Sequence, residues 1–198
     1  MANALFVGSS PVEENSVITT RKTSRANSNI VQRRPVVEET ITLSHVSPAT
    51  HAPFIAEALA EARAGVAEGG IPIGSVLVRN GQIVARGHNR RIQRNSAILH
   101  AEMDCLESIG RQTAAFYKEC TLYTTLSPCS MCSGTARLYG IPRVVVGENK
   151  TFCGDEAILR ADHVQVEVLN SKECQELLED FIKKNPSIWN EDIGIIEH

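Results

Sequence analysis

The chain has 198 residues and a formal net charge of −3 at neutral pH, and this length suffices for one domain with a substantial core. The acidic balance and the lack of a long lysine and arginine cluster argue against a nucleic-acid groove. No apolar run approaches the roughly 18 to 20 residues that a bilayer span requires, so we expect a soluble protein with no membrane contact.

The six cysteines are scattered through apolar segments, and no recognisable secretory signal peptide stands ahead of them. Disulfides form in oxidising compartments, where small secreted domains carry cysteines at paired spacings. The pattern here is typical of reduced thiols in a cytosolic chain. We therefore expect a cytoplasmic protein, with the nucleus as a second compartment.

Residues 1–50 are rich in Ser, Thr, Asn and Val with scattered charges, and they show no sustained helical or strand period. Arginine and serine are frequent in mitochondrial transit peptides, but the four glutamates of this segment are unusual for one. The composition is typical of a flexible segment. We predict a flexible N-terminal extension over residues 1–50 and one domain over residues 51–198.

The predicted domain begins with a helix and a β-hairpin. Apolar residues recur at helical spacing within residues 53–70, and the pattern ends at Gly69 and Gly70. Two alternating apolar runs in residues 75–87 then flank the pair Asn80-Gly81. This pair suits a two-residue type I′ turn, which predicts a hairpin.

Helices and strands alternate along the rest of the chain. A helix is predicted over residues 97–109 with Ser96 or Asn95 as its N-cap, and another from Ser127 with Pro128 in its first turn. The other predicted elements are strands at 120–126, 143–148 and 164–169 and helices at 155–161 and 171–184. This order predicts an α/β fold, a three-layer α/β/α sandwich with a central mixed five-stranded sheet.

Cys129 and Cys132 lie at a strand-to-helix junction, so both thiols can point at one spot from the start of the helix. A helix N-terminus lowers thiol pKa values and favours thiolates, the form that binds metals. The C-x-x-C spacing alone fits a redox pair, half of a structural zinc site or a catalytic metal site. The remaining cysteines supply no second pair for a structural zinc site.

His100 and Glu102 give the C-x-x-C pair a specific meaning. A lone helical histidine is more often a packing or surface residue, but here H-x-E precedes P-C-x-x-C, a combination typical of zinc nucleobase deaminases. One imidazole and two thiolates leave the fourth zinc position open for water, whose pKa falls towards about 7. We therefore predict His100, Cys129 and Cys132 as zinc ligands and Glu102 as the catalytic general base and acid.

Several longer stretches carry a family resemblance: EGGIPIG, GHNRRIQRNSAILHAE, TLYTTLSPCSMCSG, YGIPRVVVGEN and WNEDIG. Through them the chain resembles the fungal-type cytosine deaminases, within the cytidine deaminase-like superfamily, from about Ala58 to Gly194. The resemblance implies hydrolysis of free cytosine to uracil and ammonia in pyrimidine salvage. It also implies a homodimer with one zinc ion per subunit and a C-terminal tail that closes the site as a lid.

The resemblance further implies a set of substrate-binding residues. Asn89 would hydrogen-bond the polar edge of the base, since an amide offers both a donor and an acceptor. Ser127 would lie beside the leaving amino group through its carbonyl. The remaining residues would form the apolar wall and the cover of the pocket: Ile73, Leu126 and Ala101 in the wall, and Phe152, Trp189 and Asp192 in the cover.

The chain departs from this family at Ala101, where close relatives carry glycine, and also at Met103 and Asn190. Because His-Ala-Glu is common in purine-type deaminases, the alternative is a deaminase of guanine, isoguanine or a pterin with the same zinc chemistry. A nucleic-acid deaminase would need an open, basic entrance, which the net acidity and the closing tail disfavour. A non-enzymatic zinc scaffold would need the metal ligands but not Glu102.

Overall fold

The computed structural model describes residues 48–195, so the extension predicted over residues 1–50 lies almost wholly outside the described residues. The first described element is α1, Pro48–Ala67. Its first turn therefore contains the predicted domain boundary at residue 50. No helix within residues 48–195 has the length and apolar character that a membrane crossing requires.

The centre of the domain is a five-stranded sheet with the strand order β2-β1-β3-β4-β5. β1 pairs antiparallel with β2 and β3, whereas β4 pairs parallel with β3 and β5, so the sheet is mixed as predicted. The strands are β1 (Gly74–Arg79), β2 (Gln82–His88), β3 (Cys120–Leu126), β4 (Arg143–Glu148) and β5 (Gln165–Val168).

The turn between β1 and β2 has the backbone that its sequence predicts. Asn80 and Gly81 have φ angles of 51° and 75°, and a type I′ turn requires positive φ at both central residues. The register shifts between Leu77 and Val78, which marks an irregularity in the β1–β2 pairing. The predicted hairpin is therefore confirmed.

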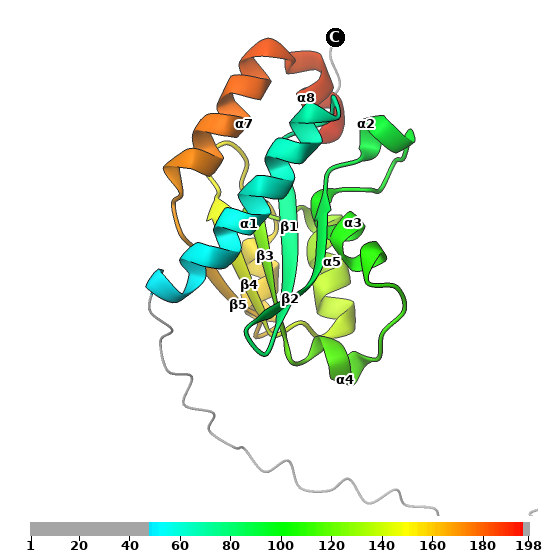
Figure 1. Cartoon of the computed structure of the whole chain (residues 1–198), viewed down its shortest axis with the longest axis vertical. Helices are drawn as coiled ribbons and strands as arrows, with labels where there is room; N and C mark the ends of the chain where they lie inside the picture. The colour runs from blue at the N-terminus through cyan, green and yellow to red at the C-terminus, as the bar shows by residue number, and fades with distance from the viewer. Residues whose placement is uncertain (1–47, 196–198) are drawn as a thin grey trace, which may run out of the picture. The chain divides into compact units, whose positions relative to one another are not determined.

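Helices cover both faces of the sheet and produce the predicted three layers (Figure 1). Along β4, Val145 packs in one cluster with Ala58 of α1, whereas Val144 packs in another cluster with Cys105 and Ala136. Because side chains alternate across a strand, these two clusters lie on opposite faces. One layer contains α1 and α7 (Lys172–Lys184), and the other contains α3 (Ala101–Ser108), α5 (Ser130–Tyr139) and α6 (Glu156–Ala161).

Two helices start later than the sequence analysis predicts. The hydroxyl of Ser96 accepts hydrogen bonds from the backbone N–H groups of Ile98 and Leu99, both 3.2 Å, and residues 97–98 form a bend ahead of the helix. His100 is therefore the N-cap of α3, with φ −65° and ψ 166°. Cys129 is likewise the extended N-cap of α5, with φ −69° and ψ 177°. The expected starts at residues 97 and 127 are wrong.

Three short helices have no counterpart in the sequence analysis, because a helix of one or two turns shows too little apolar periodicity. Two of them are α2 (Arg91–Arg94) and α4 (Ala114–Tyr117), each a single turn. The third is α8 (Pro186–Asp192), which is built from the C-terminal tail and begins with Pro186 in its first turn. α8 packs against α7 and reaches the same end of the sheet as α2 (Figure 1).

Candidate metal centre and active site

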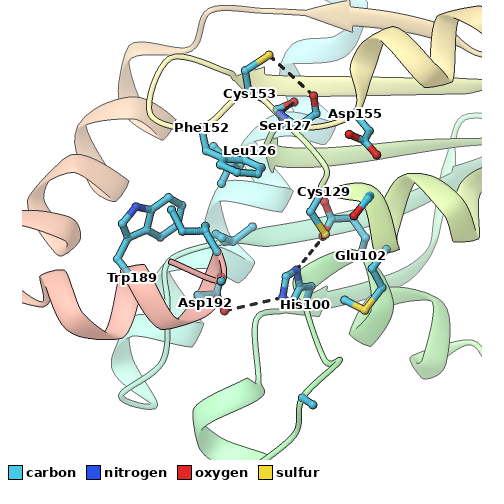
Figure 2. A pocket seen from close by; sticks show the side chains of 17 residues that line it. His100, Glu102, Leu126, Ser127, Cys129, Phe152, Cys153, Asp155, Trp189 and Asp192 are labelled. Carbon is cyan, nitrogen blue, oxygen red and sulfur yellow. Dashed lines mark hydrogen bonds and ion pairs between the residues drawn. The ribbon is translucent and has the colours of Figure 1, made fainter. Parts of the chain in front are cut away.

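The two late helix starts bring the predicted metal ligands together. His100 comes from the N-cap of α3, and Cys129 and Cys132 come from the N-cap and the first turn of α5. One ligand atom from each residue lies within 4.8 Å of the other two. Figure 2 shows the His100 ring turned towards the Cys129 sulfur from the neighbouring helix.

The spacing of these atoms fits zinc. The Sγ of Cys129 and the Nδ1 of His100 are 3.6 Å apart. A tetrahedral zinc ion with Zn–S of about 2.3 Å and Zn–N of about 2.0 Å separates its sulfur and nitrogen ligands by roughly 3.5 Å. One imidazole and two thiolates are also the soft and borderline ligands that zinc prefers.

The environment of Cys129 favours a thiolate at neutral pH. The hydrogen bond from the Cys132 thiol, helped by a second one from His100, lowers the pKa of Cys129 to about 4 against the opposing effect of burial. Metal binding requires deprotonated cysteine, so a thiolate formed before binding reduces the proton release that binding must drive. Cys129 is therefore the ligand best prepared to capture a metal ion.

Glu102 lies one residue inside α3 and is buried, with only 4% of its surface exposed. Thr124 of β3 donates a hydrogen bond from its Oγ1 to Glu102 Oε1 over 3.1 Å. Burial raises the pKa of the Glu102 carboxyl above its ordinary value. A carboxyl whose pKa moves towards neutral pH can both accept and return a proton, as a general acid and base must.

A cavity of about 420 Å³ adjoins these groups. Most of the predicted site residues line it, namely Ile73, His100, Glu102, Leu126, Ser127, Cys129, Phe152, Trp189 and Asp192. Three predicted residues are buried but lie outside its lining: Asn89, Ala101 and Cys132. Ala101 packs in an apolar cluster with Ile73, Leu126 and Trp189, so its methyl group supports the cavity wall from behind.

The C-terminal helix α8 forms one side of the cavity. Trp189 and Asp192 project from α8, and Phe152 faces them from the loop after β4 (Figure 2). The rings of Phe152 and Trp189 meet edge to face, with centroids 6.3 Å apart and an interplanar angle of 85°. Such a pair can exclude water from a flat ring bound between α8 and the metal ligands.

Asn89 joins the site through Asp192. Its Nδ2 donates to Asp192 Oδ1 over 3.2 Å, and its Oδ1 accepts the backbone N–H of Arg91 over 3.1 Å. The Arg91 side chain also donates to Asp192 Oδ1 over 2.9 Å, and His100 Nε2 lies 3.9 Å from the same oxygen. The acidic side chain of α8 therefore contacts both a predicted substrate-binding residue and a predicted metal ligand.

Ser127 is held by a buried carboxylate. Its hydroxyl donates to Glu156 Oε1 over 2.9 Å and accepts the N–H of Gly154 over 3.0 Å. Glu156 also accepts a hydrogen bond from Asn149 over 3.0 Å and pairs with Arg160. These contacts fix the backbone around Ser127, whose carbonyl is the group expected beside the leaving amine.

Three residues of this arrangement were not predicted from the sequence: Arg91, Thr124 and Glu156. Arg91 and its partner Asp192 are 101 residues apart in the chain, and Ser127 and Glu156 are 29 residues apart. Charged and hydroxyl residues in such segments look like ordinary surface or strand positions. Only the fold brings them to their partners, and no pattern within this one sequence indicates the pairing.

The sequence around this cavity matches a known protein family. Residues 48–148, just over half of the chain, match the model of the cytidine and deoxycytidylate deaminase zinc-binding region. The chain belongs to this zinc-binding deaminase family. The predicted family and the predicted zinc are both confirmed, and the ligand triangle described above is the part of this deaminase that fits the metal.

Relatives of this deaminase have named activities. A cytosine deaminase from Candida albicans is 53% identical over 138 residues, which cover 69% of this chain and 92% of that protein. The tRNA-specific adenosine deaminases of Streptococcus pyogenes serotype M18 and Bacillus subtilis are 37% and 35% identical. Each is matched over 66% of this chain, and over 89% and 88% of its own length.

Solved structures confirm the fold of this deaminase. A structure from work on tRNA:A34 deaminases superposes with a TM-score of 0.53 at 29% identity, covering 64% of this chain and 99% of that chain. A guanine deaminase from Nitrosomonas europaea superposes with a TM-score of 0.56 at 21% identity, covering 65% and 82%. At 21% identity, the second match is evidence for the fold alone.

Proposed function

We propose that the chain catalyses the hydrolytic deamination of free cytosine to uracil and ammonia. The observation that carries this proposal is that three zinc ligands, a buried carboxylate and the helix α8 meet around one cavity of about 420 Å³. Such a volume, near the lower end for small-molecule sites, suits a single heterocycle. The identity of 53% to a cytosine deaminase supports cytosine as that heterocycle.

Glu102 moves the protons of this reaction. When zinc is bound, it supplies a Lewis acid that activates water for attack on the ring carbon that bears the amino group. The Glu102 carboxylate accepts one proton from the water and delivers it to the adjacent ring nitrogen, and then transfers the second to the leaving amino group. One cytosine and one water are consumed, and one uracil and one ammonia are formed.

The remaining residues of the proposed site hold the ring. Asn89 and Asp192 face its polar edge with a donor and an acceptor, and the Ser127 carbonyl accepts a hydrogen bond from the amino group. Phe152 and Trp189 cover the ring faces and exclude water. For Ser127, Phe152, Trp189 and Asp192 these roles rest on their places in the cavity lining and on the family resemblance. Asn89 lies outside the lining, and its role rests on the resemblance and on its hydrogen bond to Asp192.

The test is a substrate panel on the zinc-loaded full chain, with ammonia release measured for cytosine, guanine, isoguanine, a pterin and transfer RNA. We expect kcat/KM for cytosine to exceed that for the other rings by about 10⁴ or more, because a site built to hydrogen-bond one ring edge leaves polar groups unpaired with another. No ammonia release from cytosine refutes the proposal. Faster turnover of a purine or pterin than of cytosine would show that this other ring is the substrate.

We also propose that nucleic acid is not a substrate, although tRNA-specific deaminases are among the relatives. Trp189 is 5% exposed, and α8 covers one side of the cavity, whereas a strand with a flipped base needs an open entrance. The transfer RNA arm of the panel tests this directly. Inosine formation at a rate comparable with uracil formation would contradict the proposal.

We further propose that the protein is a homodimer whose interface includes the C-terminal end of α5. Leu138 is 77% exposed and Tyr139 is 38% exposed, and Tyr139 borders a cavity of about 490 Å³ that Met103 and Leu106 also line. Exposed large apolar side chains next to a hollow are typical of protein interfaces. In sedimentation velocity, Leu138→Glu should convert the dimer to monomer, whereas Ile158→Glu on α6 should not; a wild-type monomer contradicts the proposal.

The proposed cellular role is pyrimidine salvage in the cytoplasm. All six cysteines are free, which supports a reducing compartment. Conversion of free cytosine to uracil returns a base to the pyrimidine pool. Expression of the chain in a pyrimidine auxotroph without its own deaminase should permit growth on cytosine, and the Glu102→Gln variant should not permit it.

A further inference from the structure

Arg91 ties the C-terminal helix to the body of the domain. From the first position of α2, its Nη1 donates to Asp192 Oδ1 over 2.9 Å and its Nη2 donates to Glu191 Oε1 over 2.7 Å. Both carboxylates belong to α8, which lies 100 residues or more further along the chain. One guanidinium group therefore holds two consecutive side chains of the helix that covers the cavity.

The contact with Asp192 is largely shielded from solvent, whereas the contact with Glu191 is exposed. The side chains of Asp192 and Arg91 are 2% and 14% exposed, but that of Glu191 is 65% exposed. A buried carboxylate without a cation costs several kcal/mol, so Asp192 depends on Arg91 for its position. The ion pair of Arg91 with Glu191 is exposed to solvent and contributes little to the stability of the contact.

Arg91 also fixes the orientation of the Asn89 amide. The backbone N–H of Arg91 donates to Asn89 Oδ1 over 3.1 Å, while Asp192, held by the Arg91 side chain, accepts from Asn89 Nδ2 over 3.2 Å. With one lone pair of the oxygen taken by an N–H group and one amide hydrogen on the carboxylate, the second lone pair and the other amide hydrogen are the groups left for a ligand. The donor and acceptor pattern of this edge is thus set by one arginine.

We propose that Arg91 is a positioning residue that latches α8 over the cavity and orients Asn89 and Asp192 for the substrate. Arg91 itself does not line the cavity. Its removal should therefore loosen the cover and weaken substrate binding more than it slows the chemical step. This inference rests on the proposed function only for its kinetic part.

The position of α8 can be followed without turnover, because Trp189 is the only tryptophan of the chain and lies on this helix. In the zinc-loaded full chain, acrylamide should quench the fluorescence of Trp189 weakly, since it is 5% exposed. We expect Arg91→Ala to raise the quenching constant at least threefold. Arg91→Lys keeps the charge but not the two-pronged geometry, so it should give an intermediate increase.

The kinetic arm separates positioning from general destabilisation. Arg91→Ala should lower kcat/KM for cytosine by about 30- to 100-fold, as expected when one partner of a buried charge pair is truncated. Most of this loss should appear in KM, with kcat within tenfold of wild type and zinc content unchanged. Arg91→Lys should recover part of the loss.

Arg94→Ala is the matched control, because Arg94 is an exposed arginine of the same helix α2. It removes the same charge and should leave quenching and KM within twofold of wild type. A quenching constant within twofold of wild type in both Arg91 variants overturns the proposal, as does an Arg91→Ala loss that falls on kcat alone. Wild-type protein inactive on cytosine counts against the proposed function only, and the quenching comparison still decides the latch.

Discussion

Replacement of Glu102 by glutamine removes the proposed proton carrier and almost nothing else. Glutamine has the shape of glutamate, and its Oε1 can still accept the 3.1 Å hydrogen bond from Thr124 Oγ1. Glu102 is not one of the three residues whose atoms form the metal site. The variant should therefore fold, bind zinc and bind the ring.

The size of the effect follows from the surroundings of the carboxyl. General acid and base catalysis contributes about 10²- to 10⁴-fold, and the contribution is largest when the pKa of the group lies near the working pH. Burial raises the pKa of Glu102 in that direction. We expect kcat to fall by about 10³- to 10⁴-fold, which is roughly 4 to 5.5 kcal/mol in the activation free energy.

The assay is initial-rate ammonia release from cytosine, with zinc per chain determined by atomic absorption on the same samples. Glu176→Gln, the same substitution on the exposed Glu176 of α7, should keep kcat within twofold of wild type. A Glu102→Gln variant that contains full zinc and retains more than a tenth of the wild-type kcat would refute the assigned role. Loss of zinc in the variant would instead show that the carboxylate helps to hold the metal.

Three further predictions concern the metal, the packing and the pH dependence. Cys129→Ser replaces a thiol whose pKa is lowered to about 4, so zinc affinity in a competition titration with a chromophoric chelator should fall about 100-fold or more. Gly87→Ala should lower the free energy of unfolding by about 2 to 3 kcal/mol in urea, because an added Cβ would lie 2.2 Å from the backbone N of Cys105 in α3. The hydrogen bond to His88 lowers the pKa of Glu68 below 4.5, so its ionised form stabilises the fold above that pH and this stabilisation disappears as the pH falls through the lowered pKa. Glu68→Gln should therefore lower the melting temperature at pH 7 and match wild type at the acidic end of a pH series.

Each of these predictions has a contrary outcome. Unchanged zinc affinity in Cys129→Ser would remove this thiol from the metal site. Gly134→Ala is the packing control, because nothing lies within 4 Å of its added Cβ and alanine favours a helix; equal stability of the Gly87 and Gly134 variants would contradict the clash. A constant difference in melting temperature between Glu68→Gln and wild type at every pH would show that the charge of Glu68 is not involved.

Much of the fold was predictable because its elements have strong local patterns. The hairpin follows from Asn80-Gly81 between alternating runs, and β4 follows from a continuous apolar run, so both were located almost to the residue. Helix starts were less predictable. Apolar periodicity continued through residues 97–100, but the Ser96 hydroxyl accepts two N–H groups there and the segment forms a bend in place of a helical turn.

The candidate metal ligands and the candidate proton carrier were also indicated by the sequence, because H-x-E and P-C-x-x-C are short motifs typical of zinc deaminases. The sequence alone could not establish that His100 and Cys129 are N-caps, which is why their side chains leave two different helices towards one point. The resemblance supplied the other residues around the cavity. Their contacts with Arg91, Thr124 and Glu156 had no local pattern.

By itself, the sequence indicated the strands and the H-x-E and P-C-x-x-C motifs, because each of these is a pattern of residues close together in the chain. The tertiary structure alone decided how the site is covered and oriented. Asn89 and Asp192 are 103 residues apart, and their hydrogen bond exists only because α8 folds back onto the end of the sheet. Arg91 holds that contact from α2, a single helical turn too short to show apolar periodicity. Its partner Asp192 becomes buried only when these distant segments pack together.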